Sequence, residues 1–312
     1  MKKPKGSLRD VLLENTDEKI LEIYSILEKD YSEVLYRENF DVSKEKLDYY
    51  TQRHCEIYSK KSEEIFENFP RCLILSSGMF GGKTTLSFLL CEKFEREGKR
   101  VEMLIADVVG EDYITARSYR GSQKKSAKRF GHLTEYKKTI ENLSESEVDV
   151  ILLDEFSFLD VKIIEDLQEM CFANDKKLIL TGLSSSYLGK LLPAFEEGSK
   201  ILKNAQIEEC FSFVPGFCEQ EPLGRNTVRY LRINNNWVLD FGLLPLVISK
   251  EKTHIVHYTP AMYEHTAVSI LKGNEELLDS ILCPSKKMVL KQNLLFGKLE
   301  RQSFPSSRER NV

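Results

Sequence analysis

The sequence predicts an α/β fold in which a parallel sheet is flanked by helices, with a small β-rich subdomain and a helical N-terminal extension. Two observations carry this prediction. Between residues 71 and 182, short apolar runs alternate with amphipathic segments, which is the pattern of βαβ units. Beyond residue 200 the runs become shorter and are separated by turns, whereas residues 1–70 carry apolar side chains at helical spacing.

We therefore expect a helical extension at 1–70, a nucleotide-binding core at 71–200, a β-rich subdomain at 201–263, and a C-terminal helical extension with a disordered tail at 264–312. Within the N-terminal extension, helices are expected around Ile20–Leu35 and over Lys44–Asn68. The sequence leaves open whether these helices pack on the core or form a surface for a partner.

The composition excludes several classes of protein. A chain of 312 residues can bury a substantial core, and a net charge of −4 provides no overall basic field for nucleic acid. The seven cysteines include no CxxC pair, which fits a reducing compartment. No apolar run is long enough to span a bilayer, and the basic N-terminus lacks the apolar stretch of a secretory signal. We expect a cytoplasmic protein without membrane association.

The most informative stretch begins with the apolar strand Cys72–Ser76, continues through a glycine-rich turn, and enters a helix expected over Thr84–Glu97. Strand, glycine-rich turn, Lys-Thr and helix are typical of the phosphate-binding loop of a RecA-like P-loop sheet. Backbone N–H groups of such a loop surround a polyphosphate, and the helix dipole favours the same anion. The predicted ATP-binding residues are Ser77, Gly78, Met79, Phe80, Gly81, Gly82, Lys83, Thr84 and Thr85.

Two side chains of this loop have specific expected roles, and one position departs from the pattern. Lys83 would place its charge on the terminal phosphates, and the Thr84 hydroxyl would bind Mg²⁺. The P-loop pattern has glycine five residues before Gly82, and this chain has Ser77 there. Gly78 comes one position later and Gly81 is an additional glycine, so the loop still has flexible positions, but not at the position that the pattern specifies.

Three further strands are expected to end at the same edge of the sheet, where ligands of parallel α/β sheets bind. They are Arg100–Ala106 before Asp107, Val148–Leu153 before Asp154-Glu155, and Lys177–Thr181 before Gly182, with a helix over Val161–Ala173. Asp154 is the candidate second ligand of Mg²⁺. Glu155 would accept a proton from an attacking hydroxyl or water. This pair suits both ATP hydrolysis and phosphoryl transfer to an alcohol.

Between the second and third of these strands, residues 117–129 are basic and rich in glycine and serine. Three interpretations are open: a solvated, mobile loop, which we favour; a nucleic-acid-binding patch, although few aromatic side chains are interleaved; and an arginine that reaches the phosphate site. After Gly182, strands are expected over Ile207–Val214, Thr227–Ile233, Trp237–Phe241 and Thr253–Tyr258, followed by a helix over Ala261–Leu271 and a polar, disordered end at 302–312.

Several motifs resemble those of type II thymidine kinases. Residues 77–85, SGMFGGKTT, resemble that family's phosphate loop, and residues 149–159, DVILLDEFSFL, resemble its strand ending in Asp-Glu. Leu180–Leu183 with Tyr187 resembles a third block, and Arg117 falls where the family has an arginine in a D-x-R-Y pattern. The resemblance extends over about Arg71–Tyr263 and implies ATP-dependent phosphorylation of a thymidine-like deoxynucleoside in DNA synthesis, by a homo-oligomer.

The resemblance also implies roles for particular residues. Glu155 would be the base for the 5′-hydroxyl, Arg117 would steady the transferring phosphate, and Lys83, Thr84 and Asp154 would hold Mg-ATP. The nucleoside base would contact Met79, Phe158, Tyr187 and Tyr258. Met79 and Phe158 have an alternative interpretation as ordinary core residues.

Some positions depart from the family. Ser157 replaces a glutamine, Leu159 a phenylalanine, and Thr115 the aspartate of D-x-R-Y. The family's β subdomain carries four cysteines on a structural zinc, whereas this region has only two cysteines. A site formed by Cys210, Cys218, His254 and His257 is conceivable, but its spacing matches no common zinc motif, so we expect no zinc.

Two alternative functions remain open at the level of sequence. One is a P-loop ATPase that acts with nucleic acid through the basic segment. The other is a nucleotide-binding regulatory or interaction protein with little catalysis, in which the helical extension is the working surface. Phosphorylation of a nucleoside distinguishes the kinase from both.

Overall fold

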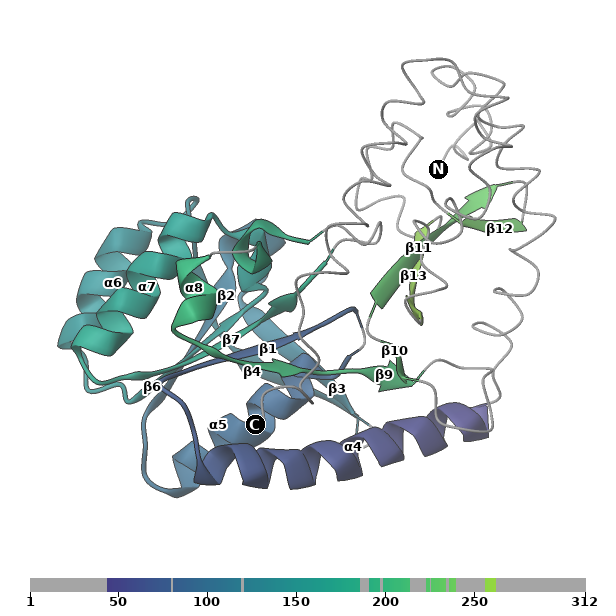
Figure 1. The fold of residues 1–312 in the computed structure, drawn as a ribbon, viewed down its shortest axis with the longest axis horizontal. Helices are drawn as coiled ribbons and strands as arrows, with labels where there is room; N and C mark the ends of the chain where they lie inside the picture. The colour runs from purple at the N-terminus through teal and green to yellow at the C-terminus, as the bar shows by residue number, and fades with distance from the viewer. Residues whose placement is uncertain are drawn as a thin grey trace, which may run out of the picture. The chain divides into compact units, whose positions relative to one another are not determined.

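A computed structural model describes residues 44–79, 81–118, 121–185, 191–196, 199–213, 223–224, 226–233, 236–239 and 256–261 (Figure 1). The chain divides into two compact units. The sheet unit consists of residues 43–184 and 191–212, and the second unit contains the remaining residues. Each unit is described by itself.

The sheet unit is built on a six-stranded sheet with the order β5-β2-β6-β7-β1-β8, in which all neighbouring strands pair in parallel. The strands are β1 (Cys72–Ser77), β2 (Val101–Ala106), β5 (Lys128–Phe130), β6 (Val150–Asp154), β7 (Lys177–Leu183) and β8 (Gln206–Glu209). This confirms the predicted α/β class. The central strands β1 and β6 are buried along their whole length and apolar up to their last one or two residues, because both faces of the sheet are covered.

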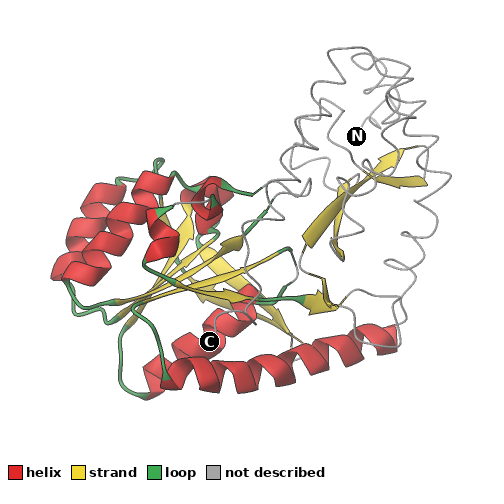
Figure 2. Cartoon of the chain, in the orientation of Figure 1, coloured by secondary structure: helices red, strands yellow, loops and turns green. Residues whose placement is uncertain are grey.

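Helices cover the two faces of the sheet, as Figure 2 shows. The helices are α4 (Lys44–Glu67), α5 (Lys83–Arg96), α6 (Tyr136–Glu145), α7 (Val161–Ala173) and α8 (Lys200–Lys203). Alternate residues of each strand enter opposite cores: Ile74 packs in the core beside α6, α7 and α8, whereas Leu73 and Leu75 pack in the core beside α4 and α5. There are three short 3₁₀ helices: η2 (Asp107–Val109) follows β2, η3 (Phe156–Phe158) follows β6, and η4 (Pro193–Phe195) lies between β7 and α8 in the described residues.

Most expected elements of this unit are present with ends displaced by a few residues. The helix expected over Lys44–Asn68 is α4, and the one expected over Val161–Ala173 is α7. Helix α4 belongs to the sheet unit, where Tyr58 and Ile65 are buried in the core beside α5. No helix in the described ranges is long and apolar enough to cross a membrane.

The expectation of a mobile loop at residues 117–129 was wrong. The chain forms an antiparallel hairpin of β3 (Tyr113–Ser118) and β4 (Gly121–Ser126), and then enters β5. Ile114 and Ala116 are buried in the core beside α5, so alternating apolar side chains anchor β3. Lys125 lies over the ring of Phe88 and pairs with Glu95 at 3.5 Å. The basic residues obscured this alternation in the sequence.

The expected strand Ile207–Val214 was also placed incorrectly. Its first part is β8, which pairs in parallel with β1 at the edge of the main sheet instead of joining a β-rich subdomain. The chain then forms β9 (Ser212–Phe213). Edge position explains the error, because β8 needs no continuous apolar run: Gln206 and Glu209 are exposed.

The second unit contains an antiparallel sheet with the order β12-β11-β13. Its strands are β11 (Asn226–Ile233), β12 (Asn236–Leu239) and β13 (Val256–Ala261), and β10 (Leu223–Gly224) precedes them. The predicted small β subdomain is therefore present. The expected helices around Ile20–Leu35 and Ala261–Leu271 and the polar end at 302–312 lie outside the described residues.

Candidate functional site

The glycine-rich loop joins β1 to α5 at the carboxyl edge of the sheet. β1 ends at Ser77, and α5 begins at Lys83. Strand β7 pairs with β1, and β6 is the next strand beyond it; they end at Leu183 and Asp154, so their ends lie at the same edge. Strand, turn and helix thus follow one another as a phosphate loop requires.

Ser77 and Gly81 fit together inside this loop. A Cβ atom at Gly81 would lie 1.9 Å from the Ser77 Oγ atom and 2.6 Å from its Cβ. The Ser77 hydroxyl therefore occupies the space that a side chain at position 81 would need, and it donates a hydrogen bond to the Gly78 carbonyl oxygen at 2.7 Å. The departure from the P-loop pattern is accommodated because the chain has glycine at position 81.

Lys83 is folded onto the loop. Its Nζ atom donates to the Gly78 carbonyl oxygen at 2.9 Å and to the Ser77 Oγ atom at 3.3 Å, and the side chain is buried. Burial lowers the pKa of Lys83, while the nearby carboxylates of Glu155 and Asp154 act in the opposite direction. A buried ammonium group therefore lies within electrostatic reach of both acidic residues.

Asp154 and Glu155 differ in their surroundings. Asp154, the last residue of β6, is buried and accepts a hydrogen bond from the Thr181 hydroxyl of β7. Glu155 has a left-handed backbone with φ of 56°, and its buried Oε2 atom has no hydrogen-bond partner within the described part of the chain. Burial, and next the charge of Asp154, raise the pKa of Glu155 to about 7, while Lys83 opposes the shift.

These groups fit Mg-ATP. The orphaned Oε2 atom of Glu155 marks an acceptor position that a ligand can satisfy, and the loop places a cation next to two carboxylates. Thr84 is in the first turn of α5, where P-loops carry a hydroxyl for the metal. Lys83, Thr84 and Asp154 would therefore hold the metal-bound triphosphate.

The remaining predicted site residues belong to several different elements. Met79 is half-buried in the loop, and Phe158 in η3 is 50% exposed, so the interpretation of Phe158 as a core residue was wrong. Phe156 is buried in the core instead, and the centroid of its ring lies 5.5 Å from that of Phe195. The Arg117 backbone lies in β3 opposite Ser122, and Tyr258 lies in β13 of the second unit. Phe80 and Tyr187 lie outside the described residues.

Sequence reasoning named Asp107 only by its position at a strand end, and the structure shows a specific contact. One carboxylate oxygen accepts hydrogen bonds from the N–H groups of Leu133 and Thr134, so Asp107 holds the loop between β5 and α6. The Ser157 hydroxyl similarly accepts from the Leu183 N–H at 3.0 Å. Two further side chains, His54 and Tyr58 on α4, lie against the phosphate loop and carried no signal in the sequence.

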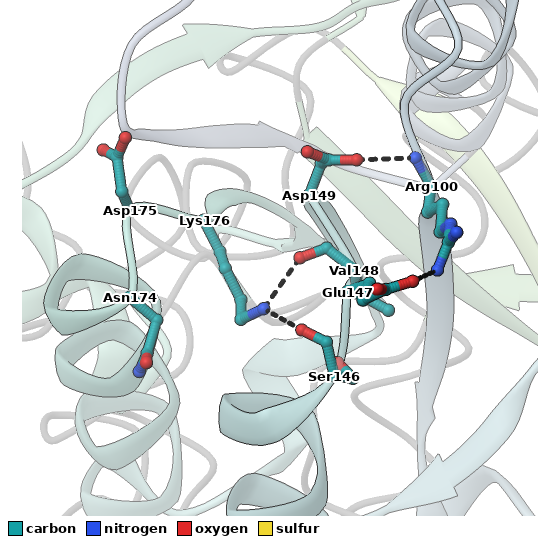
Figure 3. A pocket seen from close by; sticks show the side chains of 8 residues that line it. All are labelled: Arg100, Ser146, Glu147, Val148, Asp149, Asn174, Asp175 and Lys176. Atoms are coloured by element: carbon teal, nitrogen blue, oxygen red, sulfur yellow. Dashed lines mark hydrogen bonds and ion pairs between the residues drawn. The ribbon is translucent and has the colours of Figure 1, made fainter.

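A pocket of about 480 Å³ lies at the opposite edge of the sheet, near the amino ends of β2, β6 and β7 (Figure 3). In it, Lys176 Nζ donates to the carbonyl oxygens of Ser146 and Val148, and Asp149 accepts from the Arg100 N–H. These polar groups already satisfy one another and are remote from the phosphate loop, so this pocket is not part of the candidate site.

The predicted absence of zinc stays a prediction. Cys218 and His254 lie outside the described residues, whereas Cys210 is buried beside Tyr58. Burial raises the pKa of Cys210 to about 11. Across the described ranges, no group of three or more His, Cys, Asp and Glu side chains is arranged to hold a metal ion.

Comparison with known proteins identifies one family. Residues 72–230 match the sequence model of the family described as thymidine kinase. No curated protein matches the chain.

Among solved structures, the chain is similar to a DNA replication initiation factor, with 16% identity over 51% of this chain and 46% of that one, at a TM-score of 0.33. It is similar to AMPPCP-bound DnaA from Aquifex aeolicus, with 17% identity, 48% and 44% coverage, and a TM-score of 0.33. It is also similar to a helicase from Candida albicans, with 11% identity over 48% of this chain and 38% of that one, at a TM-score of 0.30. The chain thus spans less than half of each of these proteins.

Proposed function

The chain belongs to the thymidine kinase family, and from this premise we propose that it transfers the terminal phosphoryl group of ATP to the 5′-hydroxyl of a thymidine-like deoxynucleoside. The observation that carries the proposal is the group formed by Lys83, Asp154 and Glu155: one buried cation next to two buried or half-buried carboxylates at a glycine-rich loop. Kinases and ATPases that use a P-loop need this combination of charges.

Each residue has a distinct part in the proposed step. The nucleoside oxygen attacks the terminal phosphorus, the bond to the bridging oxygen of ADP breaks, and Glu155 takes the hydroxyl proton. Lys83 and the loop N–H groups stabilise the phosphate oxygens. Bound Mg²⁺, held by Thr84 and Asp154, would neutralise charge on the triphosphate.

A pKa of about 7 suits Glu155 to this task, because a general base is most effective when its pKa is near the working pH. The position of Glu155 directly after the buried strand β6 supports the assignment, since its backbone turns there into the left-handed region. An ordinary surface glutamate would be a weaker base.

The acceptor side of the site is proposed from the family resemblance. Met79, Phe158, Tyr187 and Tyr258 would contact the base, and Arg117 would stabilise the transferring phosphate. The exposed ring of Phe158 next to Glu155 supports its part of this proposal. We further propose a homo-oligomer, because the family resemblance implies one. From the composition and from the missing paired cysteines we propose a cytoplasmic location and no zinc.

The experiment is a turnover assay with Mg-ATP against a panel of deoxynucleosides and ribonucleosides. The proposal expects one or more nucleoside monophosphates as products. Glu155→Gln should lower the rate of transfer by roughly 10²–10⁴-fold while leaving ATP affinity near that of the parent. Glu145→Gln, at the exposed end of α6, is the matched control and should change neither quantity.

Two results would contradict the proposal. If the parent phosphorylates no nucleoside, the protein is not a nucleoside kinase, and hydrolysis of ATP stimulated by single-stranded DNA would favour an ATPase acting with nucleic acid. If transfer persists at the parent rate in Glu155→Gln, Glu155 is not the base.

A further inference from the structure

Two side chains of α4 contact the phosphate loop. The Tyr58 hydroxyl donates to the Gly81 carbonyl oxygen at 2.6 Å and accepts from the Phe211 N–H at 2.9 Å. The His54 Nε2 atom lies 2.7 Å from the Phe211 carbonyl oxygen, and its ring packs on that of Tyr58 with centroids 4.4 Å apart. Burial raises the pKa of Tyr58 above its ordinary value, so its hydroxyl keeps the proton that it donates.

These contacts determine how one peptide of the loop is oriented. The peptide between Gly81 and Gly82 is trans, so its carbonyl and N–H groups point in opposite directions. Because Tyr58 holds the carbonyl oxygen, the Gly82 N–H points away from α4.

The same rings close the space beside Gly82. A Cβ atom there would lie 2.4 Å from a ring carbon of His54 and 2.4 Å from one of Tyr58. Gly82 also has φ of 70°, which a residue with a side chain rarely adopts. Helix α4 therefore covers one side of this peptide and leaves its N–H group on the other.

We propose that Tyr58, supported by His54, is a positioning residue that directs the Gly82 N–H toward the phosphates of the bound nucleotide. A phosphate loop binds through its N–H groups, and those groups contribute fully only when they already point at the anion. The proposal rests on the proposed function only insofar as the loop binds a triphosphate. The binding of phosphate would then depend on α4 as well as on the loop itself, although α4 lies outside the P-loop sequence pattern and is separated from the loop by β1.

The test compares Tyr58→Phe with Ser62→Ala by calorimetric titration with Mg-ATP and with inorganic tripolyphosphate. Tyr58→Phe removes one hydroxyl and keeps the ring. Ser62 is also buried on α4, but its hydroxyl donates to the Ser59 carbonyl oxygen within the helix, so Ser62→Ala is a matched loss of a buried hydroxyl. We expect Tyr58→Phe to raise both dissociation constants by about 10-fold, because the Gly82 N–H is no longer held in position and its hydrogen bond to a charged phosphate oxygen is lost or weakened. Ser62→Ala should leave both within about twofold of the parent.

A purely structural role predicts a different outcome. Tyr58→Phe would then lower the melting temperature, but the folded variant would bind polyphosphate as tightly as the parent, and that result would overturn the proposal. In steady-state kinetics, our proposal expects the KM for ATP to rise while the KM for the nucleoside stays unchanged. An equal change in both constants would also contradict it.

A second pair of variants applies if Tyr58→Phe does not fold. His54→Gln can keep a donor near the Phe211 carbonyl oxygen, whereas His54→Leu cannot, so the Gln variant should bind tripolyphosphate more tightly. Equal affinities would contradict the proposal, as would a parent protein that binds no polyphosphate. A parent that binds polyphosphate but phosphorylates no nucleoside would refute only the kinase function.

Discussion

Replacing Glu155 with glutamine should stabilise the protein at neutral and alkaline pH, although it removes the proposed catalytic base. The carboxylate is largely buried, and its Oε2 atom has no hydrogen-bond partner in the described structure. Ionised Glu155 therefore weakens the folded state, and glutamine keeps the shape without the charge.

The size of the effect follows from the pKa. Raising it from 4.5 in the unfolded chain to about 7 in the folded one corresponds to roughly 3 kcal/mol. The folded state binds the proton of Glu155 more tightly than the unfolded chain does. Protonated Glu155 therefore adds to the stability of the parent protein; this added stability is fully present below pH 4.5 and is lost as pH rises to about 7. Glutamine does not titrate. The stability gained by Glu155→Gln should thus grow from about 1 kcal/mol at pH 5 to about 3 kcal/mol at pH 8. Partial access to water makes this an upper bound.

The assay is urea denaturation followed by circular dichroism between pH 5 and pH 8, with EDTA and without nucleotide. Glu145→Gln, which removes an exposed carboxylate, should track the parent over the same range. A Glu155→Gln variant that is less stable than the parent, or a difference that does not change with pH, would refute the argument that burial of this charge is costly.

Three other outcomes are expected. Lys83→Ala should abolish measurable Mg-ATP binding in calorimetry while circular dichroism shows a folded protein, and retained binding would remove the phosphate-loop assignment. Gly81→Ala should weaken ATP binding strongly. The double variant Ser77→Gly with Gly81→Ala should recover much of the affinity, because the hydroxyl that clashes with the new methyl group is gone. If the effects of the two substitutions on affinity simply add, the two positions are not sterically coupled. Elemental analysis should find little zinc, and about one zinc per chain, lost when Cys210 and Cys218 are replaced, would reverse that expectation.

The sequence predicted the sheet well because its strands carry a strong local signal. Residues 72–76 and 150–153 are apolar almost without interruption, as strands covered on both faces must be, and each run leads into polar residues of the site. The positions of Lys83, Asp154 and Glu155 followed from this order alone.

Elements with weak local signals were either misplaced or missed. β8 is a short edge strand whose pairing with β1 depends on residues more than a hundred positions earlier. Among the described side chains of the β3–β4 hairpin, the apolar ones that are buried are Ile114 and Ala116, and basic residues surround them in the sequence. The contacts of His54 and Tyr58 with the loop depend on how α4 packs, which periodicity does not specify.

Ser77 departs from the P-loop pattern and Ser157 from the family's motif, and the two serines make similar contacts in the structure. The Ser77 hydroxyl donates to the Gly78 carbonyl oxygen, and the Ser157 hydroxyl accepts from the Leu183 N–H, so both serines bond to backbone at the site. Such contacts stabilise the loops without adding a group that could take part in the chemistry. By the family resemblance, Lys83, Asp154 and Glu155 keep the charged residues of the phosphate end, whereas Ser157 lies beside the proposed nucleoside site. Divergence in this chain should therefore alter nucleoside preference before it alters the use of ATP.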